Sequence, residues 1–200
     1  CPAAKMQKRP HRRGGLMSTL PRQPPERFGE EITADHIVVT SSQSQGANSE
    51  TACVVIADRF SGYWGAFPTA DKTAESACIA FRDFLGPYVV GRYLYSDGSL
   101  ELKAVARAFR MYHGTSTPER PPSNGYVERH VRIAVEGART ILQHAGFPPQ
   151  LWTLAVRQYA FSSNVAIRDG ESAYSKRFGG EHFRGALYPF GSLVTFGPPN

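Results

Sequence analysis

The sequence has no long apolar run and few cysteines. No stretch of about 18 apolar residues is present that would cross a bilayer as a helix, so we expect no membrane partner. The three cysteines cannot form an even disulfide framework, and Cys53 and Cys78 lie within apolar patterns where a buried free thiol is the usual interpretation. We therefore expect the protein in a reducing, intracellular compartment.

Zinc-ligand spacings, catalytic nucleophiles and signal peptides are also missing. The six histidines show no metal-ligand spacing, and no Cys or Ser stands in a constellation that would activate it as a nucleophile. The amino-terminal basic residues are not followed by the apolar segment of a signal peptide. These absences argue against covalent catalysis by Cys or Ser, and we expect the chain to be a piece of a longer protein.

Positive charge is concentrated at one end of the chain. Residues 1–27 hold seven Lys and Arg residues against Glu26 alone, which accounts for the whole formal net charge of +6, so residues 28–200 balance at zero. Prolines and a Gly-Gly pair in this tail disfavour a regular helix or strand that could pack on the core. It is interpreted, with equal weight, as a basic arm that lies on phosphates or as a solvated linker. Its run 8–13 also has the composition of a nuclear-import signal.

From residue 28 onward, predicted strands alternate with predicted helices. Apolar periodicity and turn residues predict strands over 32–39, 52–57, 63–68 and 91–95, and helices over 73–85, 99–112, 124–145 and 150–165. Residues 113–125 are expected to be a loop around at most a short strand, and the irregular end of the chain to hold a last strand over 193–196. This order predicts an α/β fold that resembles the ribonuclease H-like type, with a mixed five-stranded sheet flanked by helices.

Three carboxylates fall in distinct positions of this pattern. Asp35 lies in the first strand, Asp97 follows the fourth strand at a turn, and Glu128 lies in the first turn of the long helix. Carboxylates about 4 Å apart repel by about 4 kcal/mol per pair at an effective dielectric constant near 20, so a fold that gathers them neutralises them with cations. Oxygen ligands without Cys or clustered His suit Mg²⁺ better than zinc. The pattern predicts a metal-dependent phosphoryl-transfer site, provided that the first and fourth strands are neighbours.

Each carboxylate also has a structural interpretation. Asp97 precedes a glycine and is typical of an Asx turn that caps the next helix, and Glu128 is spaced to pair with Arg132 at i+4. Asp35 is harder to explain in this way, because a carboxylate in a strand is unfavourable to bury without a partner. Asp58 is a rival acid, which its position at a turn marks as structural.

Several motifs carry a family resemblance. They are Ala34-Asp35-His36, the strand 54–58 with Phe60-Ser61, the turn Ser96-Asp97-Gly98, the segment 123–129, Ala138-Arg139-Thr140 with Leu151-Trp152, and the segment 188–192. Together they resemble the catalytic core of retroviral and retrotransposon integrases, in particular the copia-type branch, over nearly all of residues 30–196. Gly98-Ser99 stands where that family more often has Asn-Gly. Cys1 resembles the last cysteine of the family's zinc module, whose other ligands would lie upstream.

The resemblance implies two-metal phosphoryl transfer on DNA. Asp35, Asp97 and Glu128 would hold Mg²⁺, for which Mn²⁺ can substitute, with water or a DNA 3′-hydroxyl as the nucleophile of 3′-end processing and strand transfer. The implied partners are element and target DNA and further copies of the chain, and the implied place of action is the nucleus. Candidate phosphate contacts are Asn124, Arg129, Arg132 and, in the tail, Lys8, Arg9, Arg12 and Arg13.

Two other functions are compatible with the same residues. One is a decayed, non-catalytic nucleic-acid-binding remnant of a retroelement polyprotein, and the other is a ribonuclease H-like nuclease that cleaves DNA without joining it. For the domain organisation, we predict a basic linker over 1–27 that follows a missing zinc module. A catalytic core over 28–166 and a C-terminal extension over 167–200 complete the prediction.

Overall fold

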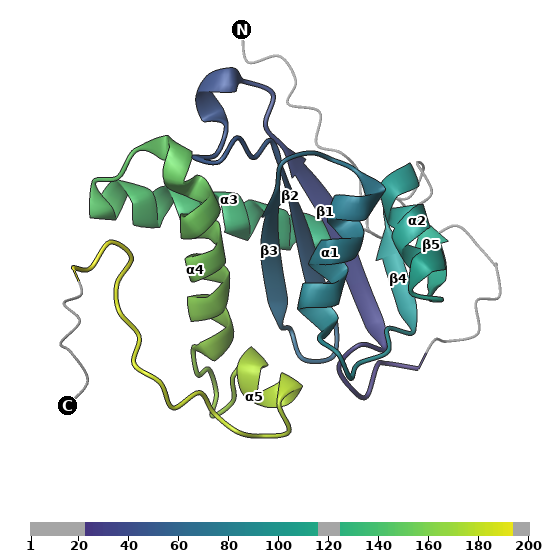
Figure 1. The fold of residues 1–200 in the computed structure, drawn as a ribbon. Coiled ribbons are helices and arrows are strands. Elements are labelled where there is room, and N and C mark those ends of the chain that lie inside the picture. Colours follow the sequence, from purple (N-terminus) through teal and green to yellow (C-terminus); the bar gives the residue numbers. More distant parts are fainter. Residues whose placement is uncertain (1–22, 116–124, 194–200) are drawn as a thin grey trace, which may run out of the picture.

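A mixed five-stranded sheet with helices on both faces forms the centre of the protein (Figure 1). The structure is a computed structural model that describes residues 23–115 and 125–193. Its strands are β1 (Glu31–Val38), β2 (Ala52–Asp58), β3 (Trp64–Thr69), β4 (Tyr93–Ser96) and β5 (Tyr112–Thr115). Its helices are the 3₁₀ turns η1 (Ser42–Ser44) and η3 (Pro149–Leu151) and the α-helices α1 (Ala74–Leu85), α2 (Leu100–Ala108), α3 (Gly125–Ala145), α4 (Trp152–Val165) and α5 (Ala173–Arg177).

The strands are arranged in the order β3-β2-β1-β4-β5. β1, β2 and β3 form an antiparallel meander, whereas β4 and β5 run parallel to β1. Parallel neighbours need a crossover, and α1 and α2 supply it between β3 and β4 and between β4 and β5. The α/β class and the mixed five-stranded sheet predicted from the sequence are therefore confirmed.

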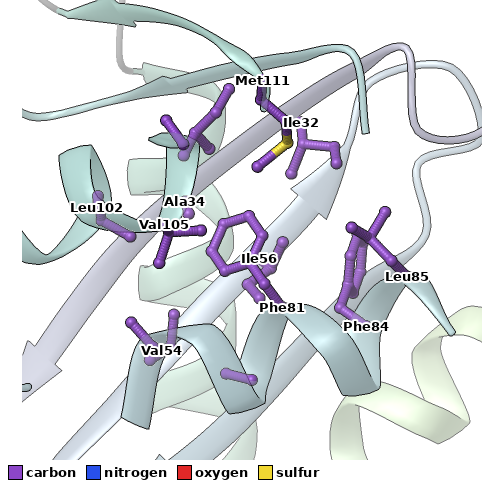
Figure 2. Close-up of a cluster of buried hydrophobic side chains, with 14 residues drawn as sticks. Ile32, Ala34, Val54, Ile56, Phe81, Phe84, Leu85, Leu102, Val105 and Met111 are labelled. Atoms are coloured by element: carbon purple, nitrogen blue, oxygen red, sulfur yellow. The ribbon is translucent and has the colours of Figure 1, made fainter. Parts of the chain in front are cut away.

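Two apolar clusters hold the helices to the sheet. Alternate residues of the central strands, among them Ile32, Val54 and Ile56, pack under α1 and α2 with Phe81 and Leu102 (Figure 2). The intervening residues face α3 and α4, where they form a second cluster. β2 is buried along its whole length, as expected for a strand with helices on both faces. Among the described residues, no helix is long and apolar enough to cross a membrane.

Helix α4 covers the edge strand β3. Asn164 of α4 is 2% exposed, and its side-chain amide accepts a hydrogen bond from the Trp64 backbone N–H (3.1 Å) and donates one to the Trp64 carbonyl (2.6 Å). The indole N–H of Trp64 also donates to Ser163 Oγ at 3.3 Å. These bonds occupy backbone groups of an edge strand that would otherwise be open to pairing with another chain.

The second helix ends earlier than predicted. It was expected to reach Tyr112, but α2 ends at Ala108 and Tyr112 begins β5. Arg110 has a φ of 54°, its N–H donates to Arg107 O, and Met111 N–H donates to Ala106 O at 2.8 Å. This is the Schellman ending of a helix, in which the left-handed position is normally glycine, so the sequence carried no stop signal.

The C-terminal end of the chain contains a short helix that was not predicted. Helix α5 lies in the segment expected to be irregular, and Ser172 caps it by accepting a hydrogen bond from Ser175 N–H at 3.0 Å. The guanidinium of Arg177 lies over Phe28 and Tyr63 and donates to Phe84 O at 2.6 Å. The last predicted strand, over 193–196, falls mostly outside the described residues.

Candidate functional site

The parallel pairing of β1 and β4 brings two of the predicted site residues together. Ala34 of β1 is paired with Ser96 of β4. The residues that follow them in the sequence are Asp35 and Asp97, which therefore lie side by side. Ile32 and Leu94, which are also paired, belong to the cluster under α1 and α2. Because side chains alternate along a strand, Asp35 points to the opposite face, on which α3 packs. The condition that the first and fourth strands be neighbours is met.

Glu128 lies on the helix that packs over this face of the sheet. It is an exposed residue in the first turn of α3, which packs on β1 and β2. Burial raises the pKa of the Asp35 carboxyl, and the negative charges of Asp97 and Glu128 raise it further, whereas a hydrogen bond from His36 N–H and the charge of Lys72 lower it. The charges of Asp97 and Glu128 therefore act on the Asp35 carboxyl group, although these residues lie 62 and 93 positions from it in the chain.

The three carboxylates do not converge on one point. In residues 23–115 and 125–193, no group of three His, Cys, Asp or Glu side chains is close enough to hold a metal ion. Asp97 Oδ1 accepts a hydrogen bond from Ser99 N–H at 3.2 Å, so the Asx turn considered for Asp97 is formed. Glu128 and Arg132 form no ion pair in this part of the chain. The donor chemistry, a half-buried carboxylate at Asp35 on which the negative charges of Asp97 and Glu128 act, nevertheless fits a hard divalent cation.

Two charged or titratable residues at the site were not assigned a role from the sequence. Lys72, in the connection between β3 and α1, interacts electrostatically with both Asp35 and His36. Both ring nitrogens of His36 are buried and have no hydrogen-bond partner among the described residues. Burial lowers the pKa of its imidazole, which favours the neutral form. The one indication of Lys72 in the sequence was its position directly before the start of the predicted helix 73–85.

Asp58 has the structural role that its position indicated. It is fully buried at the end of β2 and accepts hydrogen bonds from Gly29 N–H (2.9 Å), Ser61 N–H (2.8 Å) and Ser61 Oγ (2.7 Å). These bonds hold the turn between β2 and β3. His113 is likewise satisfied, since its Nε2 lies 2.8 Å from Ser96 Oγ. Both side chains therefore take part in hydrogen bonds within the fold.

The predicted phosphate contacts fall partly on the site. Arg132 is exposed one helical turn after Glu128, and Arg129 lines a pocket beside the start of α3. The remaining predicted contacts lie outside the described residues: Asn124, Lys8, Arg9, Arg12 and Arg13. Of the predicted phosphate contacts, the structure therefore describes only the two arginines of α3.

Comparison with known sequences finds similarity to transposon proteins. No protein-family model matches it. It is 30% identical over 135 residues to the Retrovirus-related Pol polyprotein from transposon RE1 of Arabidopsis thaliana, and 33% identical over 121 residues to that from transposon RE2 of the same plant. These matches cover 63% and 57% of the chain but only 9% and 8% of the relatives. The chain thus corresponds to a small part of such polyproteins.

Comparison with solved structures identifies the fold. A chain of the simian T-cell lymphotropic virus intasome, solved in complex with PP2A regulatory subunit B56 gamma, superposes with a TM-score of 0.60 at 18% identity, over 88% of this chain and 63% of the other. The HTLV-2 integrase catalytic core domain, solved with magnesium in a trimeric form, superposes with a TM-score of 0.55 at 17% identity, over 76% of this chain and 97% of the other. The chain is therefore a relative of copia-type transposon Pol polyproteins and has the ribonuclease H-like fold of a retroviral integrase catalytic core.

Proposed function

We propose that this chain is the catalytic core of a retroelement integrase, which processes and joins DNA ends by metal-dependent phosphoryl transfer. The observation that carries the proposal is the pairing of β1 with β4, which sets Asp35 beside Asp97 while Glu128 acts on the same carboxyl group. The relationship to transposon Pol polyproteins and the integrase fold support it. A reaction of this type needs no nucleophile from the protein.

The three carboxylates would be the ligands of Mg²⁺, or of Mn²⁺ in its place. Divalent ions, when bound, would supply nucleophile activation and charge neutralisation at the scissile phosphate. Asp35 provides a half-buried oxygen donor, and its raised pKa reflects first its burial and then repulsion by Asp97 and Glu128, which a cation would relieve. Asp97 would exchange its bond to Ser99 N–H for ligation, and the exposed Glu128 side chain is free to approach. The HTLV-2 core domain was solved in complex with magnesium, which supports this choice of ion.

The proposal includes the macromolecular partners of the reaction. DNA would be the substrate, as element ends and as target, with Arg132 on its phosphates. Several copies of the chain would act together, because the HTLV-2 core was solved in a trimeric form and the simian virus chain belongs to an intasome. Chromosomal target DNA would place the reaction in the nucleus. A zinc module upstream and further domains of the polyprotein would complete the protein.

The proposal is tested by joining of labelled DNA ends. The chain, extended upstream to restore the zinc module, is incubated with labelled end duplexes and Mg²⁺ or Mn²⁺. We expect metal-dependent nicking and strand transfer, and we expect Asp97→Asn to reduce both by about a hundredfold or more, because bound metal supplies several kcal/mol of transition-state stabilisation. Asp83→Asn, which removes an exposed carboxylate from α1, is the matched control and should keep full activity.

Two results would favour the alternatives. DNA binding without nicking or joining, in wild type and Asp97→Asn alike, would assign the chain as a non-catalytic remnant. The separation of the carboxylates and the Asx turn at Asp97 favour this non-catalytic alternative. Metal-dependent nicking without joining would instead assign a ribonuclease H-like nuclease.

A further inference from the structure

A pocket beside the carboxylates has no part in the reaction described so far. Its volume is 730 Å³, within the range of about 300 to 1,000 Å³ that is typical of small-molecule and cofactor sites. It lies between the start of α3, the end of α4 and the segment that leads into α5, and its floor includes Trp64 of β3. Arg129, Arg168 and Lys176 are its basic lining residues, and Tyr126 and Tyr159 its half-buried aromatic ones.

The pocket adjoins the carboxylate site through the first turn of α3. Glu128 and Arg129 are consecutive, so their Cα atoms are about 3.8 Å apart. Neighbouring side chains on an α-helix point about 100° apart, and Arg129 lines the pocket whereas the charge of Glu128 acts on Asp35. The first turn of α3 therefore connects the pocket with the carboxylates.

A tight turn forms the outer wall of the pocket. Arg168 and Glu171 are paired by two backbone hydrogen bonds of 2.7 and 3.1 Å, and the residues between them, Asp169 and Gly170, have φ values of 52° and 84°. Positive φ at both central positions defines a type I′ turn, for which Asp-Gly is a favoured sequence. The turn presents the Arg168 side chain from a rigid, exposed position at the pocket.

The charges around the pocket favour an anion. Lys176 Nζ pairs with Glu171 Oε2 at 3.0 Å, so these two lining charges neutralise each other. Asp169 is the other lining acid, whereas Arg129 and Arg168 form no ion pair within residues 23–115 and 125–193. Unpaired guanidinium groups beside tyrosine rings are the combination that binds a phosphate and stacks a base of single-stranded nucleic acid.

We propose that this pocket binds a nucleotide unit of the DNA strand that runs from the carboxylate site, with its phosphate on Arg129 and Arg168 and its base against Tyr159. This inference rests on the proposed function, since it takes the same DNA as its ligand. It adds a subsite for an unpaired strand end and assigns a binding role to the turn 168–171.

The test compares two arginines that lie on opposite sides of the sheet. Arg168→Ala removes the pocket cation, and Arg107→Ala removes an equally exposed arginine from α2, with the same change in net charge. Affinity of the full chain for a labelled dT12 strand is measured by fluorescence anisotropy over a range of salt concentrations. We expect Arg168→Ala to weaken binding several-fold and to lower the salt slope by about 0.7, the value for one phosphate of a single strand, and Arg107→Ala to change neither.

Trp64 provides a second measurement. The chain has two tryptophans, so in Trp152→Phe the fluorescence reports on the pocket floor alone. We expect dT12 to change this signal at saturation, and the change to require Arg168. Equal binding by Arg168→Ala and Arg107→Ala, with no change at Trp64, would overturn the inference. A signal that responds to thymidine monophosphate but not to dT12 would also overturn it, in favour of a free-nucleotide site.

Different experimental results would contradict the pocket inference and the proposed function. If Arg168→Ala joins DNA ends normally and binds DNA as Arg107→Ala does, the pocket has no role in the reaction. The integrase proposal would then still stand. Arg168-dependent binding of dT12 by a wild-type chain that joins no ends would support the pocket and remove the catalytic proposal.

Discussion

Asp35 is the residue at which stability and the proposed function conflict most directly. Burial and the charges of Asp97 and Glu128 raise the pKa of its carboxyl group. A carboxyl group whose folded-state pKa exceeds its unfolded value binds its proton more tightly in the folded protein. Its contribution to stability is therefore present at low pH and is lost as the pH rises through the folded-state pKa. At neutral pH the charged Asp35 opposes folding, and a cation at the site would remove that penalty.

We therefore expect Asp35→Asn to stabilise the protein at neutral pH. The asparagine keeps an oxygen for the His36 N–H, which donates to Asp35 Oδ1 at 2.7 Å, and carries no charge. In the presence of EDTA, the midpoint of thermal unfolding should rise at pH 7.5 and stay near that of the wild type at about pH 3, where a carboxyl group is protonated in both states. A lower midpoint at pH 7.5 would contradict this account.

Mg²⁺ provides the complementary measurement on the same pair of proteins. A ligand that binds only the folded state raises its stability according to its concentration and affinity. Added Mg²⁺ should raise the unfolding midpoint of the wild type and leave Asp35→Asn unchanged. Asp83→Asn, on the exposed side of α1, should respond like the wild type.

At the scale of the secondary-structure elements, Asn164 provides two hydrogen bonds to the backbone of β3 in the contact between α4 and β3. Asn164→Ala would leave the N–H and carbonyl of Trp64 buried without partners. Unsatisfied buried polar groups cost about 1 to 3 kcal/mol each, so we expect the free energy of unfolding to fall by about 3 kcal/mol in urea titrations. Ser163→Ala, which removes only the longer bond to the Trp64 indole, should cost less than half of that. Equal effects would show that the amide contributes nothing specific.

Element boundaries were predictable where local chemistry marks them. Thr73 caps α1 with a side-chain bond to Ser76 N–H, and Gly86 ends it with a φ of 74°, both typical signals. The end of α2 carries no such signal, because Arg110 takes the left-handed conformation that glycine usually provides. Helix α5 has a five-residue length that periodicity cannot reveal.

At the scale of the whole molecule, the formal net charge resides in residues 1–27. Their seven Lys and Arg residues and Glu26 sum to +6, and residues 28–200 balance at zero. If the tail lies on DNA, deletion of residues 1–27 should weaken DNA binding and lower the salt slope by up to about 6, or about 0.9 for each duplex phosphate released. Replacing the seven basic residues with Gln keeps the length and should have the same effect. An unchanged slope in both variants would make the tail a solvated linker.

The sequence by itself determined the order of the elements and the positions of the acids along them. Hydrophobic periodicity, caps and turn residues are local properties, and they sufficed for the α/β class and for Asp35 in a strand, Asp97 at a strand end and Glu128 at a helix start. Only the tertiary structure decided that β1 lies beside β4, because strands separated by a meander and a helical crossover pair through contacts that no local signal encodes. The same non-local packing brought Lys72 to Asp35 and enclosed the pocket beside Arg129.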